Sequence, residues 1–158
     1  VSLNPSLTDI SSLSTLAGIG SLNISTNAAL TSLHGLENIL HAHSIAIDSN
    51  HLVPSIALSA LTTVSALSIT GNSALLNLDH ALPLLQSVAT LTIQNNAALV
   101  RIAQPYTLRF TSLNSLLIDS NHALLNLKVR WQLLVLLLSC MRFAGSGVAR
   151  QRQQQRSG

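Results

Sequence analysis

The chain has few charged residues, few aromatic residues and a single cysteine. Of its 158 residues, 8% are charged and 3% are aromatic, and the one cysteine is Cys140. One cysteine excludes an internal disulfide and a metal site built from cysteines, and it leaves the redox compartment open. Because 47% of the residues are apolar, solubility must come from Ser, Thr, Asn and Gln. This composition is typical of an extracellular or cell-surface protein rather than a cytosolic enzyme.

A long apolar run and a leader sequence are also lacking. The most apolar stretch, residues 133–141, is about half as long as the ~20 residues that a transmembrane helix needs, so we expect no membrane span. The chain begins at Val1, without Met and without a charged segment followed by an apolar one. Any signal peptide is therefore already absent, and we expect a mature form or a fragment.

The few charged residues are divided unevenly along the chain. Residues 1–127 contain two arginines and five acidic residues, a net charge of −3, whereas residues 128–158 contain six basic residues and no acid, a net charge of +6. The pI near 10.0 therefore belongs to the C-terminal segment and does not indicate a nucleic-acid-binding domain. Without interleaved aromatic residues, the basic segment favours a solvated tail over a tail that binds nucleic acid or anionic membrane.

An asparagine recurs along the chain at a nearly constant interval. An isoleucine lies three residues before each of the last five of these asparagines, and a leucine or isoleucine lies five residues before it. Apolar residues recur three and six residues after each asparagine and eight residues before the next. The recurrent asparagines are Asn4, Asn27, Asn50, Asn72, Asn96 and Asn121. This period predicts a solenoid of about five to six coils, in which each Leu-x-Ile pair forms a short strand.

The recurrent asparagines are predicted to hold one coil on the next. Each asparagine follows a strand at the point where the chain must turn. Its short amide tolerates left-handed backbone geometry and can bond backbone groups that a buried turn would leave unpaired. We therefore expect a structural ladder of stacked side chains, formed by Asn27, Asn50, Asn72, Asn96 and Asn121.

These units carry a family resemblance. The chain contains "SLNISTNAALTSLHGLENI", "SALSITGNSALLNLDHAL", "ATLTIQNNAALVRI" and "SLLIDSNHALLNL". The units resemble leucine-rich repeats, in particular the L-x-I-x-x-N-x-x-L repeats of receptor L-domains, over Asn4 to about Leu127. The resemblance implies a β-rich, right-handed solenoid with one parallel strand per 22–25-residue repeat, and an extracellular recognition role. Residues 1–129 are then the solenoid, residues 130–143 an apolar capping segment, and residues 144–158 a basic disordered tail.

Two surfaces are candidates for ligand binding. Parallel strands would stack outward-facing side chains of neighbouring coils into a neutral polar patch made of Ser68, Thr70, Thr92 and Gln94. The rival surface is the loop at residues 104–107, where Tyr106 is one of few aromatic residues in the chain. A loop that touches a partner and a loop with its aromatic residue tucked inward are both compatible with this sequence.

No catalytic, cofactor or metal site is expected. The sequence contains no Gly-rich phosphate loop, no G-x-S-x-G and no H-E-x-x-H. Asp48 and Asp119 share an outward column, but three coils separate them by about 14 Å, and paired-carboxylate catalysis needs about 5–9.5 Å. His41 and His43 have metal-ligand spacing but lack a third and fourth ligand, so ordinary turn histidines are favoured. Asn23 begins an N-I-S sequon and is a possible glycosylation site.

The leading hypothesis is a non-enzymatic extracellular or cell-surface module that binds a protein or a glycan. The alternative is a structural or adhesive cell-surface or wall protein, in which the repeat itself is the function. A regular adhesive surface would repeat one residue type in its outward column, and this chain instead has Ser25, Asp48, Thr70, Gln94 and Asp119. The irregular column favours the binding module.

Overall fold

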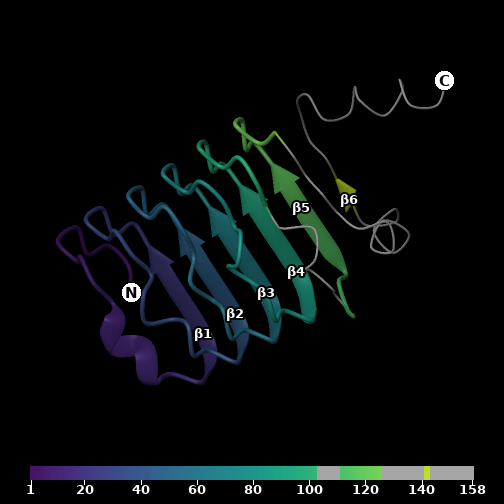
Figure 1. The fold of residues 1–158 in the computed structure, drawn as a ribbon, viewed down its shortest axis with the longest axis horizontal. Helices are drawn as coiled ribbons and strands as arrows, with labels where there is room; N and C mark the ends of the chain where they lie inside the picture. Colours follow the sequence, from purple (N-terminus) through teal and green to yellow (C-terminus); the bar gives the residue numbers. More distant parts are fainter. Residues whose placement is uncertain (103–110, 126–140, 143–158) are drawn as a thin grey trace.

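The repeated Leu-x-Ile pairs form the strands of one parallel sheet. The structure, a computed structural model, describes residues 1–102, 111–125 and 141–142. In these residues the sheet has six strands in the order in which they occur in the sequence (Figure 1). The strands are β1 (Gly18–Ser25), β2 (His41–Asp48), β3 (Thr63–Thr70), β4 (Ser87–Gln94), β5 (Ser115–Asp119) and β6 (Met141–Arg142). Because the first residues of β1 to β4 recur at the interval of the asparagines, each strand belongs to one repeat.

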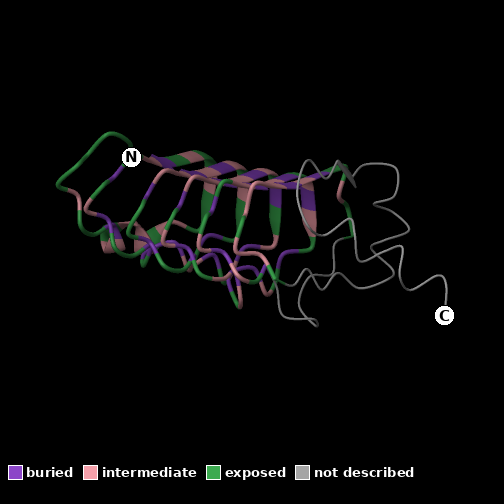
Figure 2. Ribbon diagram, turned by 90° about the horizontal axis from the view of Figure 1, so that it is seen from above, coloured by how far each residue is buried: buried purple, intermediate pink, exposed green. Residues whose placement is uncertain are grey.

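Each strand is one side of a coil that returns through irregular segments. Figure 2 shows the strands along one long side of the molecule and the returning segments along the other. The single helical element among the described residues is a short 3-10 helix, η1 (Ser11–Thr15), in the first coil. The expected β-rich repeat solenoid with parallel strands is therefore confirmed.

The inward side of the sheet and the facing turns form a continuous apolar core. The isoleucine three residues before each ladder asparagine is buried in every coil, from Ile24 in β1 to Ile118 in β5. The apolar residues three and six after the asparagines are buried in the middle coils; at the ends Ile10 is buried, whereas Leu7 and Leu124 are partly buried. The returning segments add further buried residues that the period did not predict: Leu36, Ile39, Leu58, Leu61, Ala81, Leu82 and Leu85.

The asparagine ladder joins each coil to the one before it. The side-chain Oδ1 of each of the five predicted asparagines accepts the backbone N–H of the preceding asparagine, at 3.0 to 3.3 Å. Its Nδ2 donates to a backbone carbonyl of the preceding coil, at 2.9 to 3.1 Å. Four of these asparagines are 0 to 1% exposed. Because buried backbone groups need partners, the ladder satisfies groups that the turn leaves unpaired.

The backbone geometry of the turn differs from the expectation. None of the six recurrent asparagines has a positive φ; the residue just before each of them does instead, with φ between 53° and 66°. These residues are Leu3, Thr26, Ser49, Gly71, Asn95 and Ser120. The physical reason is that the preceding residue reverses the chain, so that the asparagine itself points its amide into the coil. Only the fourth turn uses glycine, the residue that adopts this conformation without steric strain.

Thr26→Gly is expected to raise the free energy of unfolding by about 0.5–1 kcal/mol, because the left-handed penalty of a side chain exceeds the added entropy of glycine. Thr26 has a φ of 55° and is exposed. The matched control is Thr63→Gly in β3, where the backbone is extended. There the same change should lower stability by about 0.5–1 kcal/mol. Urea denaturation compares the two, and a loss of stability in both variants would contradict the account.

Several predicted features lie outside the described residues. These are the 104–107 loop with Tyr106, the tail at 144–158, and all of the capping segment at 130–143 except Met141 and Arg142. Those two residues form β6, which pairs with Leu116 and Leu117 of β5.

Candidate binding surface

The outward residues of the strands form a mostly polar surface, here called the strand face. It consists of the positions two and four residues before each ladder asparagine, and eight of these ten positions hold polar residues. Strand register places Ser68 of β3 beside Thr92 of β4, and Thr70 beside Gln94. The four residues of the predicted neutral patch therefore lie together on two neighbouring coils. All four are half-buried.

Hydrogen bonds fix the outer edge of this patch. The Thr70 hydroxyl donates to Asp48 Oδ1 at 2.5 Å, and Gln94 Nε2 donates to Asp119 Oδ2 at 3.5 Å. Thr70 of β3 therefore bonds to a carboxylate of β2, and Gln94 of β4 bonds to a carboxylate of β5. A ligand that docks between them meets oriented amide and hydroxyl groups, which is the arrangement needed for hydrogen bonding to polar partners.

The two carboxylates of the strand face lie too far apart to act together. Register links Asp48 to Thr70, Thr70 to Gln94, and Gln94 to Asp119. Three strand spacings correspond to about 14 Å, well beyond the separation that paired-carboxylate catalysis needs, about 5–9.5 Å. The structure thus agrees with the sequence in bringing no pair of carboxylates together on this face.

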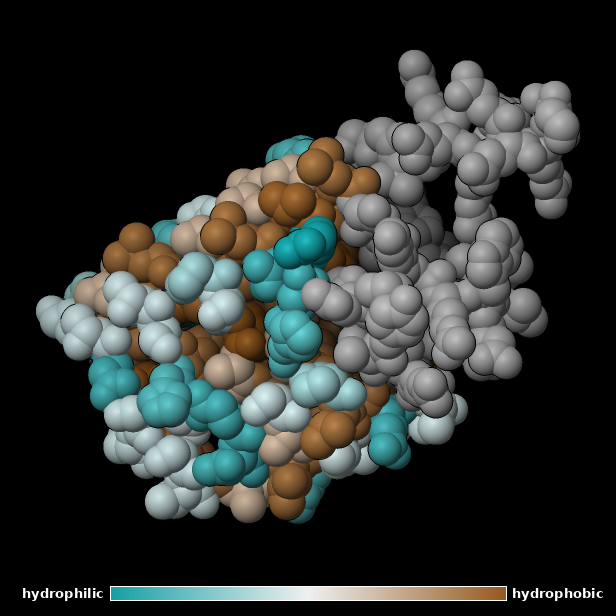
Figure 3. Space-filling model, in the orientation of Figure 1, coloured by the Kyte–Doolittle hydropathy of each residue, from teal (hydrophilic) through white to brown (hydrophobic). Residues whose placement is uncertain are grey.

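Other parts of the surface carry exposed aliphatic side chains. Large hydrophobic residues that remain at least 45% exposed include Leu52, Leu76, Leu84 and Leu125, and none of them lies in a strand. On the side of the molecule seen in Figure 3, hydrophobic and hydrophilic residues of the described part are interspersed.

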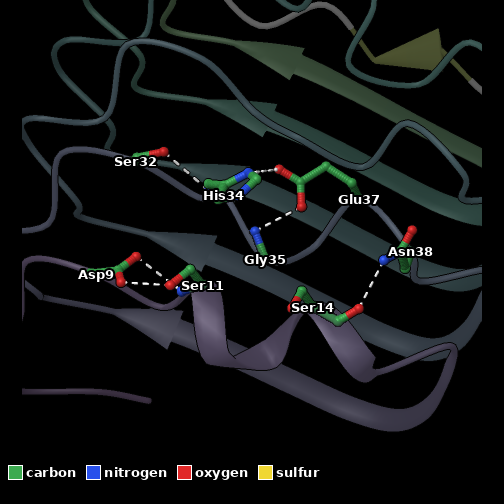
Figure 4. Close-up of polar contacts among 8 residues, drawn as sticks. All are labelled: Asp9, Ser11, Ser14, Ser32, His34, Gly35, Glu37 and Asn38. Atoms are coloured by element: carbon green, nitrogen blue, oxygen red, sulfur yellow. Dashed lines mark hydrogen bonds and ion pairs between the residues drawn. The ribbon is translucent and has the colours of Figure 1, made fainter.

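A polar cluster in the first two coils has the residue types of a catalytic site (Figure 4). His34 Nδ1 lies 2.6 Å from Glu37 Oε1, and the Gly35 N–H donates to Glu37 Oε2 at 2.7 Å. The Ser32 hydroxyl accepts the backbone N–H of His34 at 3.0 Å. The Ser32 hydroxyl thus bonds to the backbone of His34 and not to its imidazole ring. A serine nucleophile instead bonds to the ring nitrogen of its histidine base. The cluster closes a turn.

The same cluster ties the second coil to η1. Asn38 Nδ2 donates to the Ser14 carbonyl at 2.8 Å, across 24 positions of sequence. Asp9 accepts the backbone N–H and the hydroxyl of Ser11 at 2.9 and 2.6 Å, where η1 begins. Hydrogen bonds from Ser11 lower the pKa of the Asp9 carboxyl. The asparagine period does not predict these contacts, although the short His-Gly-Leu-Glu spacing is a signal for the His34–Glu37 pair.

Glu37→Gln is expected to destabilise the chain more at about pH 6 than at about pH 3. Burial alone would raise the pKa of Glu37, but hydrogen bonds from backbone N–H groups and from His34 outweigh it and lower the pKa below its ordinary 4.5. A lowered folded-state pKa gives stability that is present above pH 4.5 and is lost as the pH falls through the folded value. Thermal melting of the unmodified chain and of the Glu37→Gln variant at the two pH values measures the effect. The same difference in melting temperature between the two proteins at both pH values would contradict the prediction.

His41 and His43 lie in a strand, which corrects the expectation of turn histidines. They are the first and third residues of β2, and both are exposed. The apolar residue between them, Ala42, belongs to the inward column and pairs with Ile19 and Val64, so the pleat turns both imidazoles outward. In β1 the facing residues are glycines: His41 pairs with Gly18. A Cβ atom on Gly18 would lie 2.4 Å from His41 Nε2, so the His41 ring occupies the space that a Gly18 side chain would need.

The remaining candidates are spread over separate places. Asn23 is exposed in β1, two residues before Ser25 of its sequon. Arg101, which precedes the rival loop, bonds through Nη2 to Asp79 Oδ2 at 2.9 Å. Its partner lies one repeat earlier in the chain, and the Asp79 side chain is only 10% exposed. Tyr106 lies outside the described residues.

Within the described ranges, no group of three or more His, Cys, Asp or Glu residues is arranged to hold a metal ion. In the same part of the chain, no helix has the length and apolar character that would let it cross a membrane. Searches among known protein families, curated proteins and solved structures found no match for this chain.

Proposed function

We propose that the chain is a non-enzymatic recognition module that binds a protein or a glycan on its strand face and works outside the cell. The L-x-I-x-x-N pattern and the parallel solenoid support a receptor L-domain-like kind of leucine-rich repeat. The observation that carries the proposal is the register, which brings Ser68 and Thr70 beside Thr92 and Gln94.

Several properties of this surface suit recognition. Its side chains are short, so a partner approaches the sheet without obstruction, and its hydroxyl and amide groups both donate and accept hydrogen bonds. Extended solenoid surfaces let one partner contact several coils at once. The polar cluster of the first two coils is engaged in turn closure, which supports a binding role over an enzymatic one.

Thr70→Arg combined with Thr92→Arg is expected to abolish ligand binding, which we define as an increase in Kd of at least tenfold, and to leave the fold intact. Both side chains are outward-facing, so the added arginines cover the patch without entering the core. Ligands are first found by screening the full chain on a glycan array and on a panel of extracellular proteins. Kd is then measured by biolayer interferometry, with circular dichroism as the check of folding.

The matched control carries two arginines on exposed positions away from the strands, Thr31→Arg with Ser55→Arg, and should bind as the unmodified chain does. Tyr106→Ala tests the rival loop. Normal binding by the strand-face variant would contradict the proposal, and loss of binding in Tyr106→Ala alone would assign the site to the loop. A chain that binds nothing in either screen favours the structural or adhesive alternative.

A further inference from the structure

The two exposed histidines of β2 have a geometry that nothing in the proposed function uses. His41 and His43 are separated by one residue of the same strand and are both exposed. Residues two apart on a strand project from the same face, about 6.6 Å apart along it. Imidazole rings at that separation can lean toward each other and reach one ion at the usual metal–nitrogen distance of about 2.0–2.1 Å.

The neighbouring strands leave room for both rings. On one side β1 contributes Gly18 and Gly20, and a Cβ atom on Gly20 would meet nothing within 4 Å. On the other side Thr63 of β3 pairs with His41 and is exposed. Among the described residues, neither imidazole has a hydrogen-bond partner, whereas those of His34 and His51 contact Glu37 and Ser73. The ring nitrogens of His41 and His43 are therefore open to a ligand from solvent.

From this arrangement we propose that His41 and His43 form a surface site for a divalent transition-metal ion. Two imidazole nitrogens bind the ion and water fills its other positions, since no third protein donor converges on the pair among the described residues. Imidazole suits copper, nickel and zinc, and affinity is highest for Cu²⁺ in this series, whereas Mg²⁺ and Ca²⁺ prefer oxygen ligands.

In the structure the Nε2 atom of His41 lies over Gly18 of β1. Exposed side chains change rotamer within about picoseconds to nanoseconds, so the His41 ring is able to turn toward His43 when an ion binds.

The test is isothermal titration calorimetry of the full chain with Cu²⁺ and with Zn²⁺. The electron paramagnetic resonance spectrum of bound Cu²⁺ then reports which ligands hold the ion. Because a cysteine thiolate also binds these ions and the chain has Cys140, the titration is repeated in Cys140→Ser. We expect one saturable site per chain in both proteins, nitrogen hyperfine coupling from two imidazoles, and no saturable binding of Mg²⁺.

His41→Asn and His43→Asn should each weaken Cu²⁺ binding at least tenfold and reduce the spectrum to one coordinating imidazole. His51→Asn is the matched control, because His51 is exposed in a turn and has no histidine two residues away. The Cu²⁺ affinity of this control variant should differ less than twofold from that of the unmodified chain. All three side chains are exposed, so the fold is retained. Loss of the saturable site in Cys140→Ser, or equal effects of His51→Asn and His41→Asn, would overturn the proposal.

Discussion

Asn72→Leu is expected to lower the free energy of unfolding by about 3–5 kcal/mol, because it removes several hydrogen bonds and leaves buried partners unpaired. Asn72 is 1% exposed. Its Oδ1 accepts the Asn50 N–H at 3.0 Å, and its Nδ2 donates to the carbonyls of Ile47 and Thr70 at 3.0 and 2.9 Å. Leucine has the same number of side-chain heavy atoms but no polar atom, and its two methyl groups are larger than the planar amide. The loss therefore combines missing hydrogen bonds with tighter packing, and the hydrogen bonds between the two coils are lost.

The control for this prediction is Asn77→Leu, five residues later in the chain. The Asn77 side chain accepts one local hydrogen bond, from the Asp79 N–H at 3.1 Å, and within the described part of the chain it bonds no other coil. We expect a loss of about 1 kcal/mol, the net value of one such bond. Chemical denaturation followed by circular dichroism compares the two variants. Equal midpoints would mean that the ladder does not hold the coils together.

Gly35→Ala is expected to destabilise the chain by about 2–4 kcal/mol, through backbone strain and steric overlap together. Gly35 has a φ of 113°, and a Cβ atom there would lie 2.4 Å from the Ile10 carbonyl oxygen and 2.9 Å from Ser11 Cα. Both contacts are with backbone, which cannot move aside as a flexible side chain does. The turn that Glu37 closes must then shift away from the first coil.

Gly20→Ala provides the contrast for Gly35. Gly20 does not have a positive φ, and nothing lies within 4 Å of an added Cβ atom. This change should be neutral or stabilising by up to about 1 kcal/mol, because alanine restricts the unfolded chain. Melting temperatures of the two variants separate the effects. A similar decrease in both would indicate a general intolerance of glycine replacement rather than contact with the first coil.

The sequence predicts the architecture well because the solenoid is built from short-range repetition. The nearly constant interval between asparagines assigns the strands, the inward columns and the ladder from residue types alone. Ile47 and Asn50, for example, have the positions that the pattern predicts, one buried in β2 and one in the ladder. In such a fold each coil contacts only its neighbours, so local patterns are sufficient to predict most contacts.

The backbone of the turn was less predictable. The residue before each asparagine is a leucine, threonine, serine, glycine or asparagine, with no common chemistry. Its left-handed conformation is imposed by the ladder bonds on either side, so no composition signal reveals it. The core residues of the returning segments were also missed, since these segments vary in length and follow no fixed period.

For the candidate surface, the sequence predicts which residues are neighbours but not how their side chains bond. Ser68 and Thr92 follow directly from the register. The hydrogen bond from Thr70 to Asp48 depends on rotamers, which the period does not determine. The ion pair between Asp79 and Arg101 could have been predicted from the sequence, because its two members have opposite charge and lie one repeat apart. The expectation of turn histidines at His41 and His43 is wrong because the Leu-x-Ile pair marks only the second half of the strand, whereas β2 begins earlier, at His41.

Amide hydrogen exchange, measured by nuclear magnetic resonance, tests the ladder most directly. The backbone N–H groups of Asn50, Asn72 and Asn96 each donate to the Oδ1 of the next ladder asparagine at 3.0 Å. They should exchange as slowly as the strand amides of Ile47 and Ile69, because both sets open only when coils separate. Exchange of the three asparagine amides as fast as that of an exposed turn residue such as Ser55 would contradict a solenoid held together by stacked asparagines.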